Sequence, residues 1–267
     1  MSLDYKLFKE ELRRNAYISV PFSLSSVELS KAAEEYMVFL RLPQEIKKEM
    51  EGIKINPLDR GSYVGYRRRE QQLGDLDEKE LFQYNLYFEE FFGSKPEVRY
   101  PEVASFLQSA KNIYTQAALM MQEIIDILEG EFPGIYDQFF HKNIPPHFYL
   151  RFITYSNFVG GNFLAKGHYD RGGCTLALAE SGPGLRIGRT ADSLQDIGHH
   201  EKEVLFFPGI LFPELTSDEF VPAWHDVVQK SEYAVDDAVA RWAIVFFADQ
   251  FEQRVTSFED NHTPRRG

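Results

Sequence analysis

Three residues in the C-terminal half of the chain have the types and spacing of a metal site. His168 and Asp170 are separated by one residue, and His225 follows much further along the chain. In an extended segment side chains alternate between two faces, so both members of a His-x-Asp pair point the same way. Two imidazoles and one carboxylate can occupy one face of an octahedron and leave other positions free, as in non-haem Fe(II) oxygenases. We therefore predict that His168, Asp170 and His225 bind a metal and carry its chemistry.

Other interpretations of these residues remain open. A His-x-Asp pair is a short pattern, and a chain with seven histidines contains such pairs by chance. Zinc also binds His and Asp, although the chain has none of the local helical patterns of zinc hydrolases. Gly167, Gly172 and Gly173 flank the pair and favour turns at both ends of a strand. The remaining histidines have no partner pattern, and we expect structural or surface positions for them: His141, His147, His199, His200 and His262.

A single arginine opens the last apolar run of the chain. Arg241 begins residues 241–247, which predict a buried strand. A buried cation is costly unless it is paired, and a guanidinium has the fork geometry that holds a carboxylate by two hydrogen bonds. The partner is either the carboxylate of a ligand or an internal acidic residue, and the chain has 41 acidic residues to offer.

The elements that position these residues fall into two regions. Apolar residues at helical spacing predict helices over 29–40 and 104–128, with irregular structure and possible short strands over 61–86. From His147 onward the pattern changes to short β-rich runs separated by turn residues, which predicts a sandwich or barrel. The runs are 148–154, 174–179, 185–187, 204–207, 223–228 and 240–247.

Composition narrows the class of protein. The 267 residues are 43% hydrophobic, with 15% aromatic residues, enough for a sizeable core. A formal net charge of -12 argues against nucleic acid or an anionic membrane as a partner. Cys174 is the single cysteine, and the chain shows neither a secretion signal nor a long apolar span. We expect a cytoplasmic protein that acts on a small molecule.

The motifs together resemble the isopenicillin N synthase-like branch of the Fe(II)/2-oxoglutarate oxygenases. The metal-binding strand continues into a Gly-Leu-Arg-Ile segment at 184–187, and a Pro-Gly pair at 208–209 precedes the His-Asp-Val-Val of 225–228. Upstream, residues 39–47 are similar to the family's Leu-Pro-x-Glu-x-Lys stretch, and Gly65, Tyr66 and residues 77–82 match its Gly-Tyr and Lys-Glu-x-Phe signals. The resemblance runs from about residue 15 to 250.

This resemblance implies a mixed α/β (α+β) fold. Residues 147–250 would form a double-stranded β-helix (a cupin-like jelly roll) with the metal site, and residues 1–140 a helix-rich N-terminal region with packing helices. The whole of 1–267 would be one oxygenase domain. It also implies that the three metal ligands bind Fe(II), while Arg241 and Tyr155 bind 2-oxoglutarate.

The implied reaction uses O2 and 2-oxoglutarate to hydroxylate, desaturate or cyclise a small molecule, with release of succinate and CO2. Because Asp170 occupies the carboxylate position, no site is left for a halide, and halogenation is disfavoured. The substrate would be a compound such as an amino acid or a natural-product intermediate. The sequence does not indicate an oligomeric state.

The sequence departs from the family pattern where the cosubstrate would bind. Ala243 replaces the serine of Arg-x-Ser, Ile153 replaces an asparagine, and the interval from His225 to Arg241 is long, at 16 residues. Each lost hydrogen bond to a charged group costs roughly 1.5–3 kcal/mol. Two alternatives therefore stay open: an oxidase of the same fold that does not use 2-oxoglutarate, and a retired enzyme that acts as a metal-binding or sensor protein.

Substrate-binding residues are weakly indicated. Tyr66, Arg68 and Arg69 lie where the family places substrate-facing residues, and Phe163 and Trp224 are close to the metal ligands in sequence. For the arginines, together with Arg67, a solvated run of charge is the competing interpretation. For the two aromatic residues, a place in the core competes.

Overall fold

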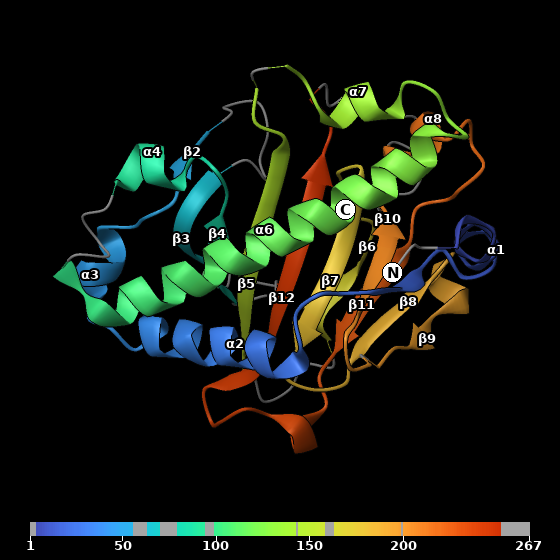
Figure 1. Cartoon of the computed structure of the whole chain (residues 1–267). Coiled ribbons are helices and arrows are strands. Elements are labelled where there is room, and N and C mark those ends of the chain that lie inside the picture. The colour runs from blue at the N-terminus through green and yellow to red at the C-terminus, as the bar shows by residue number, and fades with distance from the viewer. Residues whose placement is uncertain are drawn as a thin grey trace, which may run out of the picture.

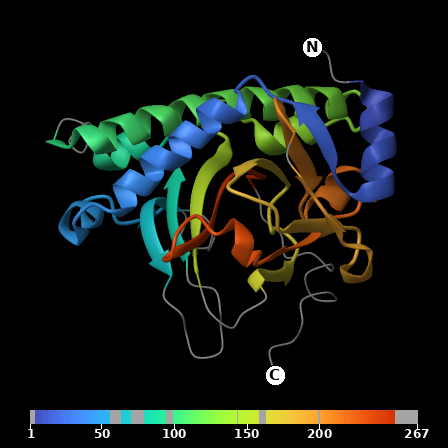
Figure 2. The ribbon, with the colours of Figure 1, turned by 90° about the horizontal axis from the view of Figure 1, so that it is seen from below.

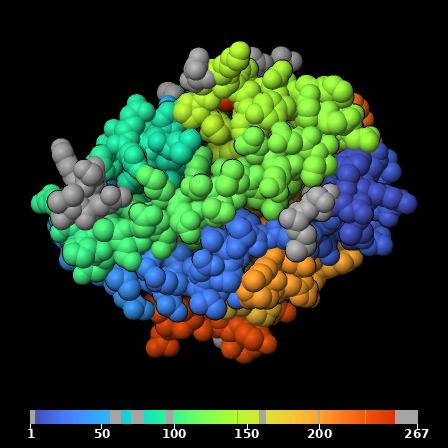
Figure 3. All heavy atoms as spheres, viewed as in Figure 1, coloured from blue at the N-terminus to red at the C-terminus, as the bar shows by residue number. Residues whose placement is uncertain are grey.

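The chain folds into two antiparallel sheets and a layer of helices. The computed structural model describes residues 4–55, 63–69, 79–93, 99–142, 144–157, 163–198 and 200–251. The larger sheet has the order β1-β10-β7-β12-β5-β4-β3-β2, and the smaller has the order β6-β11-β8-β9. Helices α2 and α6 lie side by side across the larger sheet (Figures 1 and 2). They cover that face of the molecule in the space-filling view (Figure 3). This agrees with the mixed α/β class expected from the sequence.

The bounds of the strands follow the expected pattern. The larger sheet contains β1 (Ile18–Pro21), β2 (Ile53–Lys54), β3 (Tyr63–Arg69), β4 (Lys79–Tyr84), β5 (His147–Ser156), β7 (Cys174–Glu180), β10 (Glu203–Pro208) and β12 (Val239–Asp249). The smaller sheet contains β6 (Phe163–His168), β8 (Leu185–Gly188), β9 (Gln195–Asp196) and β11 (Trp224–Val228). All six β-rich runs expected after His147 are strands. The expected irregular region 61–86 contributes β3 and β4, which extend the sheet beside β5.

The helices are α1 (Tyr5–Asn15), α2 (Ser26–Leu40), α3 (Gln44–Lys48), α4 (Phe88–Phe92), α6 (Pro101–Glu129), α7 (Ile135–Phe139) and α8 (Phe212–Leu215). Short 3-10 turns are η1 (Ala191–Ser193) and η2 (Ser231–Tyr233). Helix α2 begins at a capping box in which Ser25 and Glu28 satisfy each other's backbone N–H groups. Both helices expected from periodicity are confirmed, as α2 and α6. Among the described residues, no helix is long and apolar enough to cross a membrane.

An aromatic core joins the helices to the larger sheet. Phe39 of α2, Phe106 of α6 and Phe82 of β4 are fully buried, and the Phe82 and Phe106 ring centroids lie 4.8 Å apart. Phe152 of β5 joins them, with its ring 5.0 Å from Phe106. Burying rings of this size contributes much of the hydrophobic stabilisation of a domain. This face of the larger sheet therefore forms the main hydrophobic core together with the helices.

The other face of the larger sheet packs against the smaller sheet and carries the functional candidates. A second apolar cluster lies there, with Ile153 and Tyr155 from β5, Ala243 from β12 and Val227 from β11. Because strand side chains alternate, Phe152 points to the helices while Ile153 and its same-face neighbours point between the sheets. The space between the sheets is thus where β5, β7, β12, β6 and β11 present their inward side chains.

Candidate metal centre and its pocket

The three expected metal ligands meet at the edge of the smaller sheet. His168 is the last residue of β6, and His225 lies directly opposite it on the antiparallel strand β11. Opposite positions on paired strands bring side chains together, and the two imidazole centroids are 4.3 Å apart. Asp170 differs from expectation, because β6 ends at His168 and Asp170 lies in the irregular segment that follows. The carboxylate therefore reaches the rings from just beyond the strand end.

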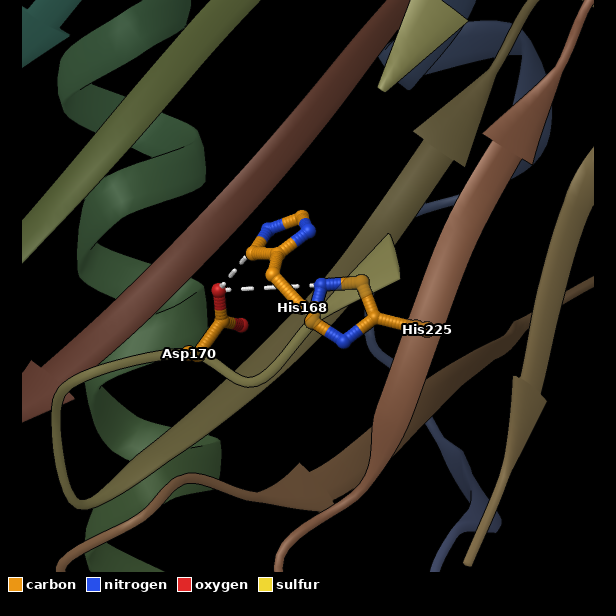
Figure 4. Close-up of side chains that lie close together, drawn as sticks. All are labelled: His168, Asp170 and His225. Atoms are coloured by element: carbon orange, nitrogen blue, oxygen red, sulfur yellow. Dashed lines mark ion pairs between the residues drawn. The ribbon is translucent and has the colours of Figure 1, made fainter. Parts of the chain in front are cut away.

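The donor atoms of these residues converge. One ligand atom from each of His168, Asp170 and His225 lies within 4.8 Å of the others, which is the one such group found among the residues that the structure describes. Asp170 Oδ1 is 3.9 Å from His168 Nε2 and 3.7 Å from His225 Nε2, and Figure 4 shows the three side chains turned toward one another. Two imidazole nitrogens and one carboxylate oxygen fit Fe(II) or another borderline divalent metal.

Hydrogen bonds hold each ligand in the orientation that a metal needs. His168 Nδ1 is 2.8 Å from the Lys166 carbonyl oxygen, and His225 Nδ1 is 3.2 Å from that of Ala223. A carbonyl oxygen only accepts, so each Nδ1 carries a proton, and Nε2 is the nitrogen of each ring that is left to bind a metal. Partners of this kind fix the tautomer and ring angle of metal-binding histidines.

Thr175 completes this arrangement and was not singled out from the sequence. Its hydroxyl on β7 donates a 2.6 Å hydrogen bond to Asp170 Oδ2. That bond occupies one carboxylate oxygen and leaves Oδ1 for the metal. A sequence signal exists, since Thr175 lies five residues after Asp170, but only the fold places the two side chains in contact.

The His168 imidazole is in the form that binds metal. Desolvation, and then the neighbouring His225, lower the pKa of the His168 imidazole to about 4, although 47% of the side chain is exposed. The imidazole of His168 is therefore neutral at pH 7, and no proton has to leave before a metal binds. Gly167 is required beside it, because a Cβ there would lie 2.7 Å from the Trp224 ring.

A pocket between the two sheets contains the metal ligands together with Arg241 and Tyr155. The pocket walls are mainly apolar, with Ile153, Val245 and Phe247 from the larger sheet. Arg241 and Tyr155 are paired residues on β12 and β5, so the strands hold both at one place. The structure thus brings together all five residues expected to bind metal and cosubstrate.

Arg241 already has an internal partner. Its guanidinium forms an ion pair with Glu180 of β7, and the two side chains are only 5% and 8% exposed. Desolvation lowers the pKa of Arg241 to about 10, so the guanidinium stays charged at pH 7, and its buried Nε has no hydrogen-bond partner. Of the two partners considered for this arginine, the internal acidic residue is the one present. Sequence reasoning did not single out Glu180.

Two further cations line the pocket and were also missed. Arg151 and Tyr155 lie on the same face of β5, and Lys79 of β4 places its Nζ 4.9 Å from the Tyr155 ring centroid. Strand alternation offered a signal for Arg151, because it lies four residues before Tyr155 and must share its face.

The residues proposed from sequence for substrate binding lie elsewhere. The lining of the pocket includes none of Tyr66, Arg68, Arg69, Phe163 and Trp224. Tyr66 is buried in the helix-side core and donates a hydrogen bond to Glu80. Arg68 and Arg69 are exposed on β3, and the Trp224 ring packs edge-on against Tyr169. Their role in substrate binding stays a prediction. His199 and His262, like residues 77 and 78 of the family motif, lie outside the described residues.

Comparison with known proteins finds similarity only at the level of structure. No protein-family model and no curated protein sequence matches the chain. A full-length Neurospora crassa protein solved in complex with alpha-KG matches with a TM-score of 0.68 and 20% identity, over 92% of this chain and 78% of that one. The dioxygenase for auxin oxidation 1 from Arabidopsis thaliana, bound to 2-oxoglutarate, matches with a TM-score of 0.68 and 14% identity, over 96% of this chain and 92% of that one.

A third solved structure, JOX2 in complex with 2OG, Fe and JA, matches with a TM-score of 0.68 and 17% identity, over 92% of this chain and 70% of that one. At these identities the likeness concerns the fold. The chain therefore shares the fold of solved oxygenases that bind 2-oxoglutarate.

Proposed function

We propose that this protein is an Fe(II)- and 2-oxoglutarate-dependent oxygenase of the isopenicillin N synthase-like type, with a double-stranded β-helix core in a single domain. The observation that carries the proposal is the convergence of His168 Nε2, His225 Nε2 and Asp170 Oδ1 at the wall of a pocket. The similarity to solved oxygenases that bind 2-oxoglutarate supports it. The substrate would be a small molecule that is hydroxylated, desaturated or cyclised.

The residues of the metal site have distinct roles in this proposal. His168 and His225 would hold iron through Nε2, while their Nδ1–H groups stay on backbone carbonyls. Asp170 would bind through Oδ1, because Thr175 keeps Oδ2 occupied. When bound, iron with 2-oxoglutarate would supply the oxidation, in which substrate, O2 and the oxo acid are converted to oxidised substrate, succinate and CO2. The apolar walls exclude water from the reacting groups.

Arg241 would bind the distal carboxylate of 2-oxoglutarate by exchanging partners. The guanidinium is charged, buried and at present paired with Glu180, so an incoming carboxylate must replace one anion with another. Such an exchange keeps the charge of the arginine compensated, which a buried cation requires. Tyr155, the cross-strand partner of Arg241, would add a hydroxyl beside the same carboxylate.

The same contact favours a second candidate, an oxidase of this fold that does not use 2-oxoglutarate. If Glu180 is the permanent partner of Arg241, the anchor for the cosubstrate is already filled. Ala243 on the adjacent inward position offers no hydroxyl to a bound carboxylate. A retired metal-binding protein has no comparable support, because both imidazoles and the carboxylate keep their aligning hydrogen bonds.

Cosubstrate turnover separates these possibilities. Purified protein is loaded with Fe(II) without oxygen, 2-oxoglutarate is added, and succinate is measured after exposure to O2. We expect succinate from the native chain, and none from Asp170→Ala. Asp192→Ala, which removes an exposed carboxylate of η1 away from the pocket, is the matched control and should retain activity. Iron binding without any 2-oxoglutarate binding or succinate would overturn cosubstrate use and favour the second candidate.

A further inference from the structure

We propose that Arg151 is the anchor for the carboxylate of the substrate, and therefore that the substrate is a small organic acid. This inference extends the proposed function, because it names the substrate class of the same pocket. Arg151 lies on the inward face of β5 and lines the pocket that contains the metal ligands. It is distinct from Arg241: their positions on the paired strands β5 and β12 are offset by four residues, roughly 13 Å along a strand.

One edge of the Arg151 guanidinium is fixed by the protein. Its Nε and Nη2 both donate to Gln83 Oε1, at 3.0 and 2.7 Å. Gln83 is fully buried, and its own Nε2 donates to the Tyr63 carbonyl oxygen at 2.7 Å. That second bond decides which amide atom faces the arginine, because only the nitrogen of Gln83 can donate to a carbonyl. The guanidinium is thus held in a defined plane.

The opposite edge is open to a ligand. A guanidinium has five N–H groups, and two of them donate to Gln83. The N–H groups of Nη1 and the second N–H of Nη2 therefore form an edge that can donate two hydrogen bonds to a carboxylate. Within the described part of the chain, no carboxylate forms an ion pair with Arg151 and no other acceptor bonds to it. Arg241, in contrast, is paired with Glu180. Asp170 and Asp249 act on the Arg151 charge only at longer range, so of the two arginines of the pocket Arg151 is the one without a direct ion pair among the described residues.

Aromatic rings surround the same guanidinium. Its carbon atom lies 4.8 Å from the Phe247 ring centroid, 5.4 Å from that of Tyr149 and 5.8 Å from that of Tyr63. The Phe247 and Tyr149 rings stack at 5.1 Å, which leaves the arginine little freedom. A rigid, preorganised fork loses little entropy when it binds a carboxylate. Ring faces beside it favour a ligand with a flat apolar body.

Strand register connects this anchor to the metal site. Thr175, which holds Asp170, lies opposite Phe247 on the paired strands β7 and β12, and Phe247 packs on Arg151. A carboxylate on Arg151 would therefore hold a substrate at the end of the pocket nearest the Asp170 side of the metal site. Arg241 and Glu180 would be left for the cosubstrate.

Binding to the metal-free protein tests the anchor independently of iron. The probes are phenylacetate and phenylacetamide, which share one body and differ in charge, and calorimetry measures both dissociation constants. We expect the native chain to bind phenylacetate about tenfold or more tightly than the amide, because hydrogen bonds between charged partners are stronger than those to a neutral amide. Arg151→Gln should remove this preference, and Arg151→Lys should keep only part of it. Circular dichroism checks that each variant is folded.

The matched control is Arg99→Gln, which removes an exposed arginine paired with Glu49 outside the pocket. It should bind both probes as the native chain does. Equal binding of the two probes by the native chain, or an unchanged preference in Arg151→Gln, would overturn the anchor. So would loss of 2-oxoglutarate binding to the Fe(II)-loaded Arg151→Gln protein, because Arg151 would then serve the cosubstrate. Since the probe experiment contains neither iron nor 2-oxoglutarate, its failure is distinguishable from failure of the proposed oxygenase activity.

Discussion

The two ends of the pocket, one with the metal-ligand candidates and one with Arg241, stabilise their buried polar groups in different ways. At the metal end, each ligand is aligned by a neutral partner: backbone carbonyls for His168 and His225, and the Thr175 hydroxyl for Asp170. At the other end, the charge of Arg241 is matched by the charge of Glu180. Neutral partners leave the donor atoms Nε2 and Oδ1 available, whereas a charged partner already compensates the charge of the arginine without any ligand.

This difference suggests that the ends respond differently to change. The group of His168, Asp170 and His225 would be stabilised by a bound cation, because two imidazoles and a carboxylate at close range gain most when a metal joins them. At the Arg241 end the charge is already compensated, and a ligand carboxylate binds there only by competing with Glu180. Mutations should therefore separate metal affinity at one end from fold stability at the other.

The largest effect is expected from removing a metal ligand. Asp170→Ala or His225→Ala should abolish stoichiometric Fe(II) binding, because two remaining donors cannot fill one face of an octahedron. Metal content after anaerobic loading and desalting measures this. The exposed Asp192→Ala variant should keep one iron per chain. Full iron content in Asp170→Ala would place the metal elsewhere.

The next largest effect concerns stability at the other end. Arg241→Met removes the ion pair between Arg241 and the Glu180 carboxylate, and should lower the free energy of unfolding by about 3–5 kcal/mol. Denaturant unfolding measures the loss. Arg99→Gln breaks an exposed ion pair and should leave stability nearly unchanged. The double variant Arg241→Met with Glu180→Gln should recover part of the loss. Equal stability of Arg241→Met and the native chain would mean that the pair is not buried as described.

A smaller effect is expected from the partner of a ligand. Thr175→Val keeps the shape of the side chain and removes its hydrogen bond to Asp170, which should weaken Fe(II) binding roughly 10- to 100-fold. Metal titration in competition with a chelator measures the change. Thr115→Val, at an exposed threonine of α6 that bonds only to the Lys111 carbonyl, is the matched control. An unaltered iron affinity in Thr175→Val would show that the hydroxyl does not orient Asp170.

The smallest effect is expected at the competing carboxylate. Glu180→Gln frees Arg241 from its internal ion pair, so 2-oxoglutarate should bind the Fe(II) protein about tenfold more tightly. Anaerobic titration of the charge-transfer absorption measures the affinity. Weaker binding in Glu180→Gln would mean that Glu180 supports the cosubstrate site and does not compete for it.

The sequence was sufficient to predict the contact between His168, Asp170 and His225, but not the partner of Arg241. The spacing of His168 and Asp170 and the strand around His225 predicted a contact that strand pairing provides. The partner of Arg241 depends on how β7 lies beside β12, and that pairing contains a register shift between Ile244 and Val245. A local pattern carries no information on such a shift, so Glu180 could not be chosen among 41 acidic residues.

The same limit explains the strands that the sequence left uncertain. Four residues of β3 are buried and the three arginines that follow are exposed. Apolar and polar residues therefore do not alternate along this strand, and that alternation is the sequence signal of a half-buried strand. The helices α2 and α6 were predictable because their apolar residues repeat at helical spacing over several turns. Arg151 was overlooked because its neighbours read as an apolar strand, although its spacing of four residues from Tyr155 places both side chains on one face.

Anomalous diffraction at the iron absorption edge, from crystals loaded anaerobically with Fe(II) and 2-oxoglutarate, tests the proposed metal site most directly. We expect one iron peak bonded to His168 Nε2, Asp170 Oδ1 and His225 Nε2, with the 2-oxoglutarate carboxylate on Arg241 in place of Glu180. An iron peak away from these three atoms, or no peak in a folded protein, would contradict the proposed metal site.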